Sequence, residues 1–186
     1  LVKRGIEAVR VGHPARVNPL LRKHTLDYIL EDSETYQEAQ KLREKAMNLN
    51  DQQEKYTHPS GKWRRGMSDR KIKQLAKQGR GSRGVPGKKI KEMAEWLDLQ
   101  EEINFLFKHI NILEDEAVEE IFKDAQVICA TNSTAGSEIL NDRHFDLLVH
   151  DEATQSTEPS SLIPLTKADK IVMAGDHKQL PPTILN

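Results

Sequence analysis

Two apolar segments that end in acidic and amide side chains constrain the fold of this chain more than any other feature. The first spans residues 145–155 and reads FDLLVHDEATQ, and the second spans residues 170–182 and reads KIVMAGDHKQLPP. Apolar runs of this kind are typical of buried parallel strands, and α/β sheets bind ligands at the carboxyl ends of such strands. Residues 157–165 are long enough for a crossover helix. The pattern therefore predicts an α/β fold in which two neighbouring strands deliver polar groups to one edge of a parallel sheet.

The motifs at these two strand ends resemble those of a known enzyme family. DEATQ at 151–155 and GDHKQLPP at 175–182 resemble motifs II and III of superfamily 1 helicases. They are most similar to the branch that contains the nonsense-mediated-decay RNA helicase, senataxin and the immunoglobulin-mu-binding helicase. GHPARV at 12–17 and CATNSTAG at 129–136 resemble further motifs of that branch. The resemblance implies an internal piece of the first RecA-like domain of an ATP-dependent helicase, which moves on single-stranded RNA or DNA.

The resemblance assigns roles to five residues and implies two cofactors, ATP and Mg²⁺. Asp151 occupies the position that holds Mg²⁺ through a coordinated water, and Glu152 that of the base or water-positioning group. Gln155 is expected to reach the same water or the phosphate. Asp176 is expected to orient its loop, and Gln179 to sense the γ-phosphate, so that Asp151 and Gln179 are the predicted nucleotide contacts.

The resemblance also places four residues beside the bound nucleic acid. His13 and Arg16 follow a strand predicted at 8–11, and Thr131 and Asn132 end a strand predicted at 126–131. Ordinary turn formation by small polar residues is the alternative explanation of these segments.

A basic, turn-rich stretch at about 55–91 supplies a second set of candidate contacts. Its lysines and arginines are interleaved with Tyr56 and Trp63, as in many phosphate-binding surfaces. A solvated charged loop is the alternative. The candidates for direct contact with nucleic acid are Lys62, Arg64, Arg65 and Lys71.

The middle of the chain has the periodicity of helices. Apolar residues recur at three- and four-residue spacing over 20–30, over 33–50 and over 88–123, with a break expected near 113–116. The last two segments are predicted to form an antiparallel stalk that carries the basic loop. The expected domains are a RecA-like part at 1–19, a helical insertion at 20–122, and a RecA-like part with motifs II and III at 123–186.

His150 is a departure from the resembled family, which usually has an aliphatic residue before the Asp-Glu pair. A histidine in a buried strand is costly unless it is hydrogen-bonded. We expect His150 to be paired locally as a structural residue, and tuning of Glu152 is the alternative.

The missing motifs limit what these 186 residues are expected to do alone. The sequence has no G-x-x-x-x-G-K-[ST] phosphate loop and no second motor domain, so we expect an excerpt of a longer protein that hydrolyses ATP negligibly by itself. A single cysteine excludes an internal disulfide, and no run is apolar enough for a membrane span. We expect an intracellular monomer without a membrane partner. The rival hypothesis is a non-catalytic module that binds nucleic acid or protein through the stalk and its basic tip.

Overall fold

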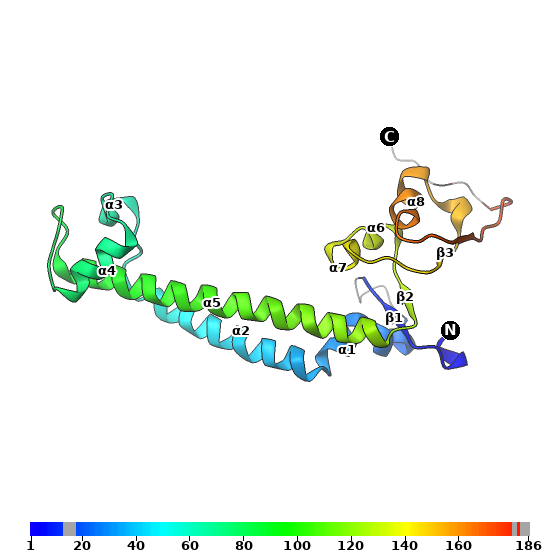
Figure 1. Cartoon of the computed structure of the whole chain (residues 1–186), viewed down its shortest axis with the longest axis horizontal. Coiled ribbons are helices and arrows are strands. Elements are labelled where there is room, and N and C mark those ends of the chain that lie inside the picture. Colours follow the sequence, from blue (N-terminus) through cyan, green and yellow to red (C-terminus); the bar gives the residue numbers. More distant parts are fainter. Residues whose placement is uncertain (13–17, 180–181, 183–186) are drawn as a thin grey trace. The chain divides into compact units, whose positions relative to one another are not determined.

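The computed structural model describes residues 1–12, 18–179 and 182. The chain forms two compact units, one of residues 1–29 and 122–186 and one of residues 30–121. We call the first the strand unit and the second the hairpin unit. Long helices and short parallel strands confirm the predicted α/β class with a long helical segment (Figure 1). No helix in the described part of the chain is long and apolar enough to cross a lipid bilayer.

The strand unit holds two pairs of parallel strands. β1, Ala8–Arg10, pairs with β2, Val127–Cys129. β3, Leu148–His150, pairs with β4, Ile171–Met173, and places His150 opposite Met173. Because β3 and β4 are parallel, the polar segments that follow them emerge at the same edge, as the sequence predicted.

Short helices connect and cover these strands. They are η1 Val2–Arg4, η3 Pro19–His24, α1 Leu26–Glu31, α6 Asn132–Ala135, α7 Glu138–Asn141, η4 Ala153–Gln155 and α8 Glu158–Leu165. The single helix expected over 20–30 is instead a 3₁₀ segment followed by α1. Thr25 separates the two because its buried side chain donates to the carbonyl of Arg22 at 2.7 Å and its backbone bridges to Arg10.

The hairpin unit is built on two antiparallel helices, α2, Glu34–Gln53, and α5, Gly87–Asp124 (Figure 1). The Ser33 hydroxyl caps α2 by accepting from the Tyr36 amide at 3.3 Å. α5 is continuous, so the break predicted near 113–116 is wrong. The acidic stretch there is used in pairing, since Glu114 accepts from Arg43 of α2 at 2.5 Å.

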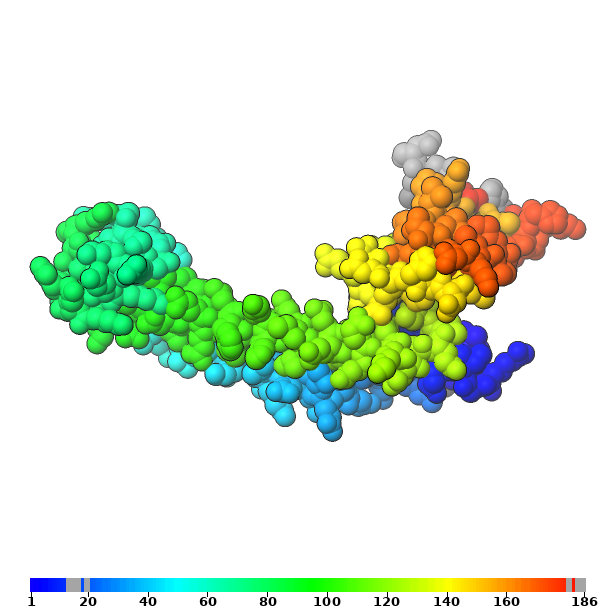
Figure 2. Space-filling model, viewed as in Figure 1, coloured from blue at the N-terminus to red at the C-terminus, as the bar shows by residue number. Residues whose placement is uncertain are grey.

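Small side chains allow α2 and α5 to approach closely, and Figure 2 shows their side chains in contact along the hairpin. Ala39 and Ala46 of α2 are seven residues apart and fully buried, as is Ala117 of α5. A seven-residue repeat is the seam of coiled-coil packing. Gln53 continues the repeat in α2, and its buried amide donates to the Trp96 carbonyl and to Gln100, both at 3.1 Å.

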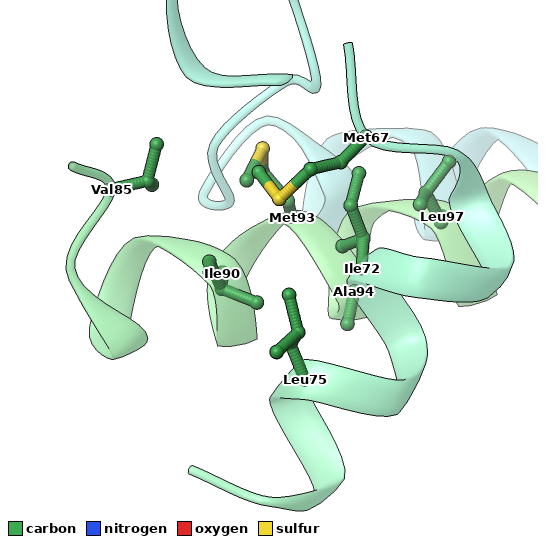
Figure 3. Close-up of a cluster of buried hydrophobic side chains, with 8 residues drawn as sticks. All are labelled: Met67, Ile72, Leu75, Val85, Ile90, Met93, Ala94 and Leu97. Atoms are coloured by element: carbon green, nitrogen blue, oxygen red, sulfur yellow. The ribbon is translucent and has the colours of Figure 1, made fainter. Parts of the chain in front are cut away.

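The far end of the hairpin carries a small folded subdomain, residues 54–86, which we call the tip. Its helices are α3, Gly61–Arg64, and α4, Asp69–Lys77, and the Ser68 hydroxyl caps α4 by accepting from the Lys71 amide at 3.3 Å. Figure 3 shows apolar side chains of α4, of two loops and of the first turns of α5 gathered in one cluster. The buried cluster consists of Met67, Ile72, Leu75, Val85, Ile90, Met93, Ala94 and Leu97.

Reciprocal hydrogen bonds of two arginines join the two loops of the tip that contain Arg65 and Arg83. The Arg65 guanidinium donates to the Arg83 carbonyl at 2.8 Å, and the Arg83 guanidinium donates to the Arg65 carbonyl at 2.5 Å. Both residues have a left-handed backbone, and a glycine with positive φ, Gly66 or Gly84, follows each of them. The glycine-rich loop at 79–87 is therefore anchored by this pair and by buried Val85.

Charged side chains join the tip to α5. Lys73 of α4 donates to Asp98 at 2.7 Å and to Glu101 at 2.6 Å. Its burial acts to lower the lysine pKa, but the two carboxylates outweigh this effect and raise the pKa above its usual value. On α5, the Glu92 carboxylate accepts from Lys89 at 2.6 Å and from the Thr57 hydroxyl, and these hydrogen bonds lower its pKa.

We expect the Glu92 contacts to make the tip sensitive to acid. A carboxylate with a lowered pKa contributes stability that is complete above its ordinary pKa of 4.5 and is lost as the pH falls through the lowered value. Trp63 and Trp96 lie against the tip core, so their fluorescence should report an acid transition. Glu92→Gln should flatten this transition, whereas Glu95→Gln, at an exposed position of the same helix, should leave it unchanged. The same profile in wild type and Glu92→Gln would contradict the assignment.

Candidate functional site

The site begins where β3 ends and the chain turns sharply at Glu152. This residue has a left-handed backbone, with φ 53° and ψ 36°, which costs a non-glycine residue roughly 1–2 kcal/mol. The Asp151 carboxylate accepts from the Glu152 amide at 3.0 Å, and the Ala153 amide donates to the Ala174 carbonyl at 2.8 Å. These bonds hold the turn, so that both acids are exposed beyond the strand. The sequence pattern did not predict the left-handed conformation.

The loops after β3 and β4 bring three predicted residues together. The Gln155 side-chain amide donates to the Glu152 carboxylate at 3.1 Å and also to the Gln179 side-chain carbonyl. Gln155 is in η4, whereas Gln179 follows β4, so the contact joins two segments that are separate in the sequence. All three side chains are exposed to solvent. The arrangement presents a carboxylate and two amides at one edge of the strand pair.

Asp176 organises the loop after β4. Its carboxylate accepts from the Lys178 amide at 2.9 Å, and its carbonyl accepts from the Gln179 amide at 3.1 Å. The same carbonyl accepts from the Thr154 hydroxyl at 3.2 Å. Asp176 thus sets the course of the segment that carries Gln179.

Gly175 and Thr154 are site residues that the sequence analysis missed. A Cβ atom at Gly175 would lie 2.9 Å from the backbone nitrogen and both outer side-chain atoms of Thr154. The two loops therefore meet closely enough to exclude any side chain at position 175. The available signal was a glycine placed between an apolar strand and an acid.

A polar cluster lies behind the acids. His150 is 5% exposed, its Nδ1 is 3.2 Å from the Asp151 carbonyl oxygen, and its Nε2 is 3.4 Å from the Asn132 amide nitrogen. Asn132 also donates to the hydroxyls of Ser156 at 2.9 Å and Ser160 at 3.2 Å. The local pairing expected for His150 is therefore present. An open pocket of about 360 Å³ is lined by Asn132, His150, Asp151, Glu152, Gln155, Ser156, Thr157, Ser160 and Pro182.

The residues predicted to contact nucleic acid in the strand unit have different surroundings. His13 and Arg16 lie outside the described residues. Thr131 is exposed and caps α6, because its hydroxyl accepts from the Thr134 amide at 3.2 Å. Asn132 is half-buried, and its side-chain amide is directed to the polar cluster.

The four basic candidates of the tip divide into two pairs. Arg64 and Arg65 are used within the tip, since Arg64 donates to the Met67 carbonyl at 2.9 Å and pairs with Asp69, and Arg65 forms the arginine pair described above. Lys62 lies over the Trp63 ring with its nitrogen 5.1 Å from the ring centre. Lys62 and Lys71 are exposed, and within the described part of the chain neither forms an ion pair.

The exposed acids fit Mg²⁺ bound together with a nucleotide. Within the described ranges no three His, Cys, Asp or Glu side chains are grouped as a metal cage. Mg²⁺ commonly uses one or two carboxylates, with water and substrate phosphates completing its octahedron. Asp151, with one oxygen committed to the Glu152 amide, can supply such a ligand.

Comparison with known proteins places the chain in a family. A family model described as the AAA domain matches residues 1–186. A protein of Methanocaldococcus jannaschii named as an uncharacterized ATP-dependent helicase is 47% identical over 181 residues, which are 97% of this chain and 27% of that protein. The DNA-binding protein SMUBP-2 of Mesocricetus auratus is 31% identical over 182 residues, 96% of this chain and 15% of that protein. The ATP-dependent helicase upf1 of Schizosaccharomyces pombe is 38% identical over 91 residues, 48% of this chain and 9% of that protein.

The chain thus spans between about a tenth and a quarter of the length of these relatives. Their names confirm the resemblance to the helicase branch that the four motifs indicated. Since the family model covers every residue, the chain belongs to the AAA domain family, and its relatives are ATP-dependent helicases.

Proposed function

We propose that this chain forms part of the motor of an ATP-dependent helicase that moves on single-stranded RNA or DNA. The observation that carries the proposal is the meeting of Glu152, Gln155 and Gln179 at one edge of β3 and β4. Residues that act on one γ-phosphate must converge in this way, because phosphoryl transfer depends on positioning and on electrostatic stabilisation. The names of the relatives support ATP as the nucleotide.

Each residue of the site has a proposed task. Asp151 holds Mg²⁺ through water, and the bound ion would neutralise charge on the phosphates. Glu152 orients the attacking water and accepts its proton, and Gln155 holds the Glu152 carboxylate through the 3.1 Å hydrogen bond. Gln179 contacts the nucleotide together with Asp151. Asp176 positions Gln179 through its loop.

The proposed domain plan assigns residues 1–19 and 123–186 to a RecA-like domain and residues 20–122 to a helical insertion. His13, Arg16, Thr131 and Asn132 contact the nucleic acid from the RecA-like part. From the tip, Lys62 and Lys71 contact phosphates, and Arg64 and Arg65 maintain the fold that presents them.

The complete protein provides the test of this function. Its ATP hydrolysis should be measured with and without single-stranded RNA and single-stranded DNA, and at least one of the two should stimulate turnover. The identity of the stimulating strand would define the substrate. Absence of hydrolysis with both nucleic acids would contradict the proposal.

The folded, basic tip also supports the second candidate function, that of a non-catalytic module that binds nucleic acid. In the complete protein, the double variant Lys62→Glu and Lys71→Glu should weaken single-strand binding. Each lost phosphate contact should reduce the slope of log affinity against log salt concentration by about 0.7. Fluorescence anisotropy at several salt concentrations measures both quantities.

A control double variant distinguishes direct phosphate contacts of Lys62 and Lys71 from the effect of the protein's net charge on affinity. Lys41→Glu and Lys108→Glu make the same change of charge at exposed positions of α2 and α5, outside the tip. They should leave the salt slope unchanged. Equal losses in both double variants would show that the tip lysines act only through net charge.

A further inference from the structure

The His150 ring lies between two polar groups of the strand unit. The Asp151 carbonyl oxygen, 3.2 Å from Nδ1, can only accept, so Nδ1 carries the hydrogen. The Asn132 amide nitrogen, which can only donate, lies 3.4 Å from Nε2 and shares its two hydrogens among this nitrogen and the hydroxyls of Ser156 and Ser160. The His150 imidazole therefore lies between the Asn132 side chain and the backbone carbonyl of Asp151.

That carbonyl belongs to the peptide group between Asp151 and Glu152. The orientation of this peptide sets the direction in which Glu152 leaves β3, and Glu152 has an unusual φ of 53°. Such a conformation persists only where surrounding contacts enforce it. The buried His150 ring supplies one of these contacts, and the Asp151 carboxylate, which accepts from the Glu152 amide at 3.0 Å, supplies another.

On its other side, His150 is connected to the segments proposed to contact nucleic acid. Asn132 is the first residue of α6, directly after Thr131. A Cβ atom at Gly12, the first residue of the GHPARV motif, would lie 3.5 Å from the Thr134 hydroxyl of the same helix. One helical turn thus adjoins Gly12 and supplies the side chain that contacts His150.

α6 also packs tightly against α8. A Cβ atom at Gly136 would lie 2.9 Å from Cγ2 of Ile163, and Asn132 donates to Ser160 of α8 at 3.2 Å. Close-packed elements of this kind move together rather than deform. A displacement of α6 would therefore be passed to the imidazole and not absorbed between the helices.

We propose that His150 is a positioning residue that couples nucleic-acid binding at α6 to the orientation of Glu152. The path runs from Thr131 and Asn132 through the imidazole to the peptide group that precedes Glu152. The inference rests on the proposed function and adds a route by which the nucleic acid controls hydrolysis. Asn132 acts in it by holding the imidazole.

The test uses the complete protein and compares ATP turnover with and without a saturating single-stranded oligonucleotide. His150→Leu fills the space of the ring but has no hydrogen-bonding groups. It should lower the stimulated rate at least roughly tenfold, because misplacing a reacting group by ~1 Å can cost about a hundredfold. His150→Asn puts an amide nitrogen near the position of Nδ1, from which it can donate to the Asp151 carbonyl, and should restore most of the stimulation. A purely structural role gives no reason for this rescue.

A double-mutant cycle tests whether Asn132 and His150 act as one unit. If they do, Asn132→Ala combined with His150→Leu should be no worse than His150→Leu alone. Ser160→Ala, which removes another partner of Asn132, should retain stimulation. Oligonucleotide affinity should be measured for every variant, so that lost binding is distinguished from lost coupling.

Each result decides between the two proposals. The coupling role would be overturned if the nucleic acid stimulates His150→Leu as fully as it stimulates the wild type. Additive effects in the double-mutant cycle would overturn it as well. Neither result would contradict the proposed motor function. If His150→Leu does not fold, Asn132→Ala decides in the same way, because unaltered stimulation in Asn132→Ala overturns the role. A wild-type protein that hydrolyses no ATP would overturn both.

Discussion

Replacing Glu152 by glutamine in the complete protein is expected to lower ATP turnover by about 10²–10⁴-fold, the usual contribution of a general base. Glutamine has nearly the same shape and can still accept the hydrogen bond that Gln155 donates at 3.1 Å. The backbone turn and the neighbouring loops should therefore be preserved, and only the basic, charged carboxylate is lost. Steady-state hydrolysis and strand unwinding should fall together. Nucleic-acid affinity, measured by fluorescence anisotropy, should stay at its wild-type value.

Glu158→Gln is the matched control for this substitution. Glu158 is exposed in the first turn of α8, in the same unit, and forms no part of the residues that line the pocket. Its replacement should leave hydrolysis and unwinding unchanged. If Glu152→Gln also unwinds at the wild-type rate, the non-catalytic binding module becomes the better explanation of the chain.

The second large effect is expected in the tip, where Ile72→Ala should unfold the subdomain locally. The Ile72 side chain is fully buried among the eight residues of the tip cluster. A large-to-small change at such a site lowers the free energy of unfolding by about 2–5 kcal/mol, because apolar contacts are lost and a cavity is left behind. A core this small contributes only a small free energy of unfolding. Hydrogen exchange should show lost protection over residues 61–97 with unchanged protection in β1 to β4.

The control for Ile72→Ala is Gln74→Ala in the same helix, where the side chain is exposed. This change should have little effect, since surface substitutions usually fall within about 0.5 kcal/mol. Unchanged exchange in Ile72→Ala would show that contacts outside the cluster hold the tip. Loss of protection throughout the chain would show instead that the two units unfold together.

The sequence predicts well those features that follow from periodicity and from the ends of strands. The convergence of Glu152, Gln155 and Gln179 follows from two apolar runs joined by one crossover, since parallel strands end at the same edge. The Ser33 and Ser68 hydroxyls accept from free amides at the starts of α2 and α4, which is the usual role of a polar residue before a helical pattern.

Features that depend on partners distant in the sequence could not be predicted. The acids near 114 suggested a break in α5, but their pairing with Arg43 of α2 is visible only in the folded hairpin. The same limit applies to Asn132, whose turn-like surroundings gave no sign that its amide would reach Ser160 and His150. It applies also to Arg65, whose partner is 18 positions away.

The left-handed backbone at Glu152 has a consequence for engineering this protein. Glycine adopts positive φ without steric cost, so Glu152→Gly relaxes the chain at the point where it removes the carboxylate. Under the role proposed for Glu152 in turnover, selection for thermal tolerance and selection for ATP turnover would therefore favour different residues at this position. A laboratory-evolution campaign that screens for heat resistance alone would favour loss of the carboxylate that is proposed to act in ATP hydrolysis.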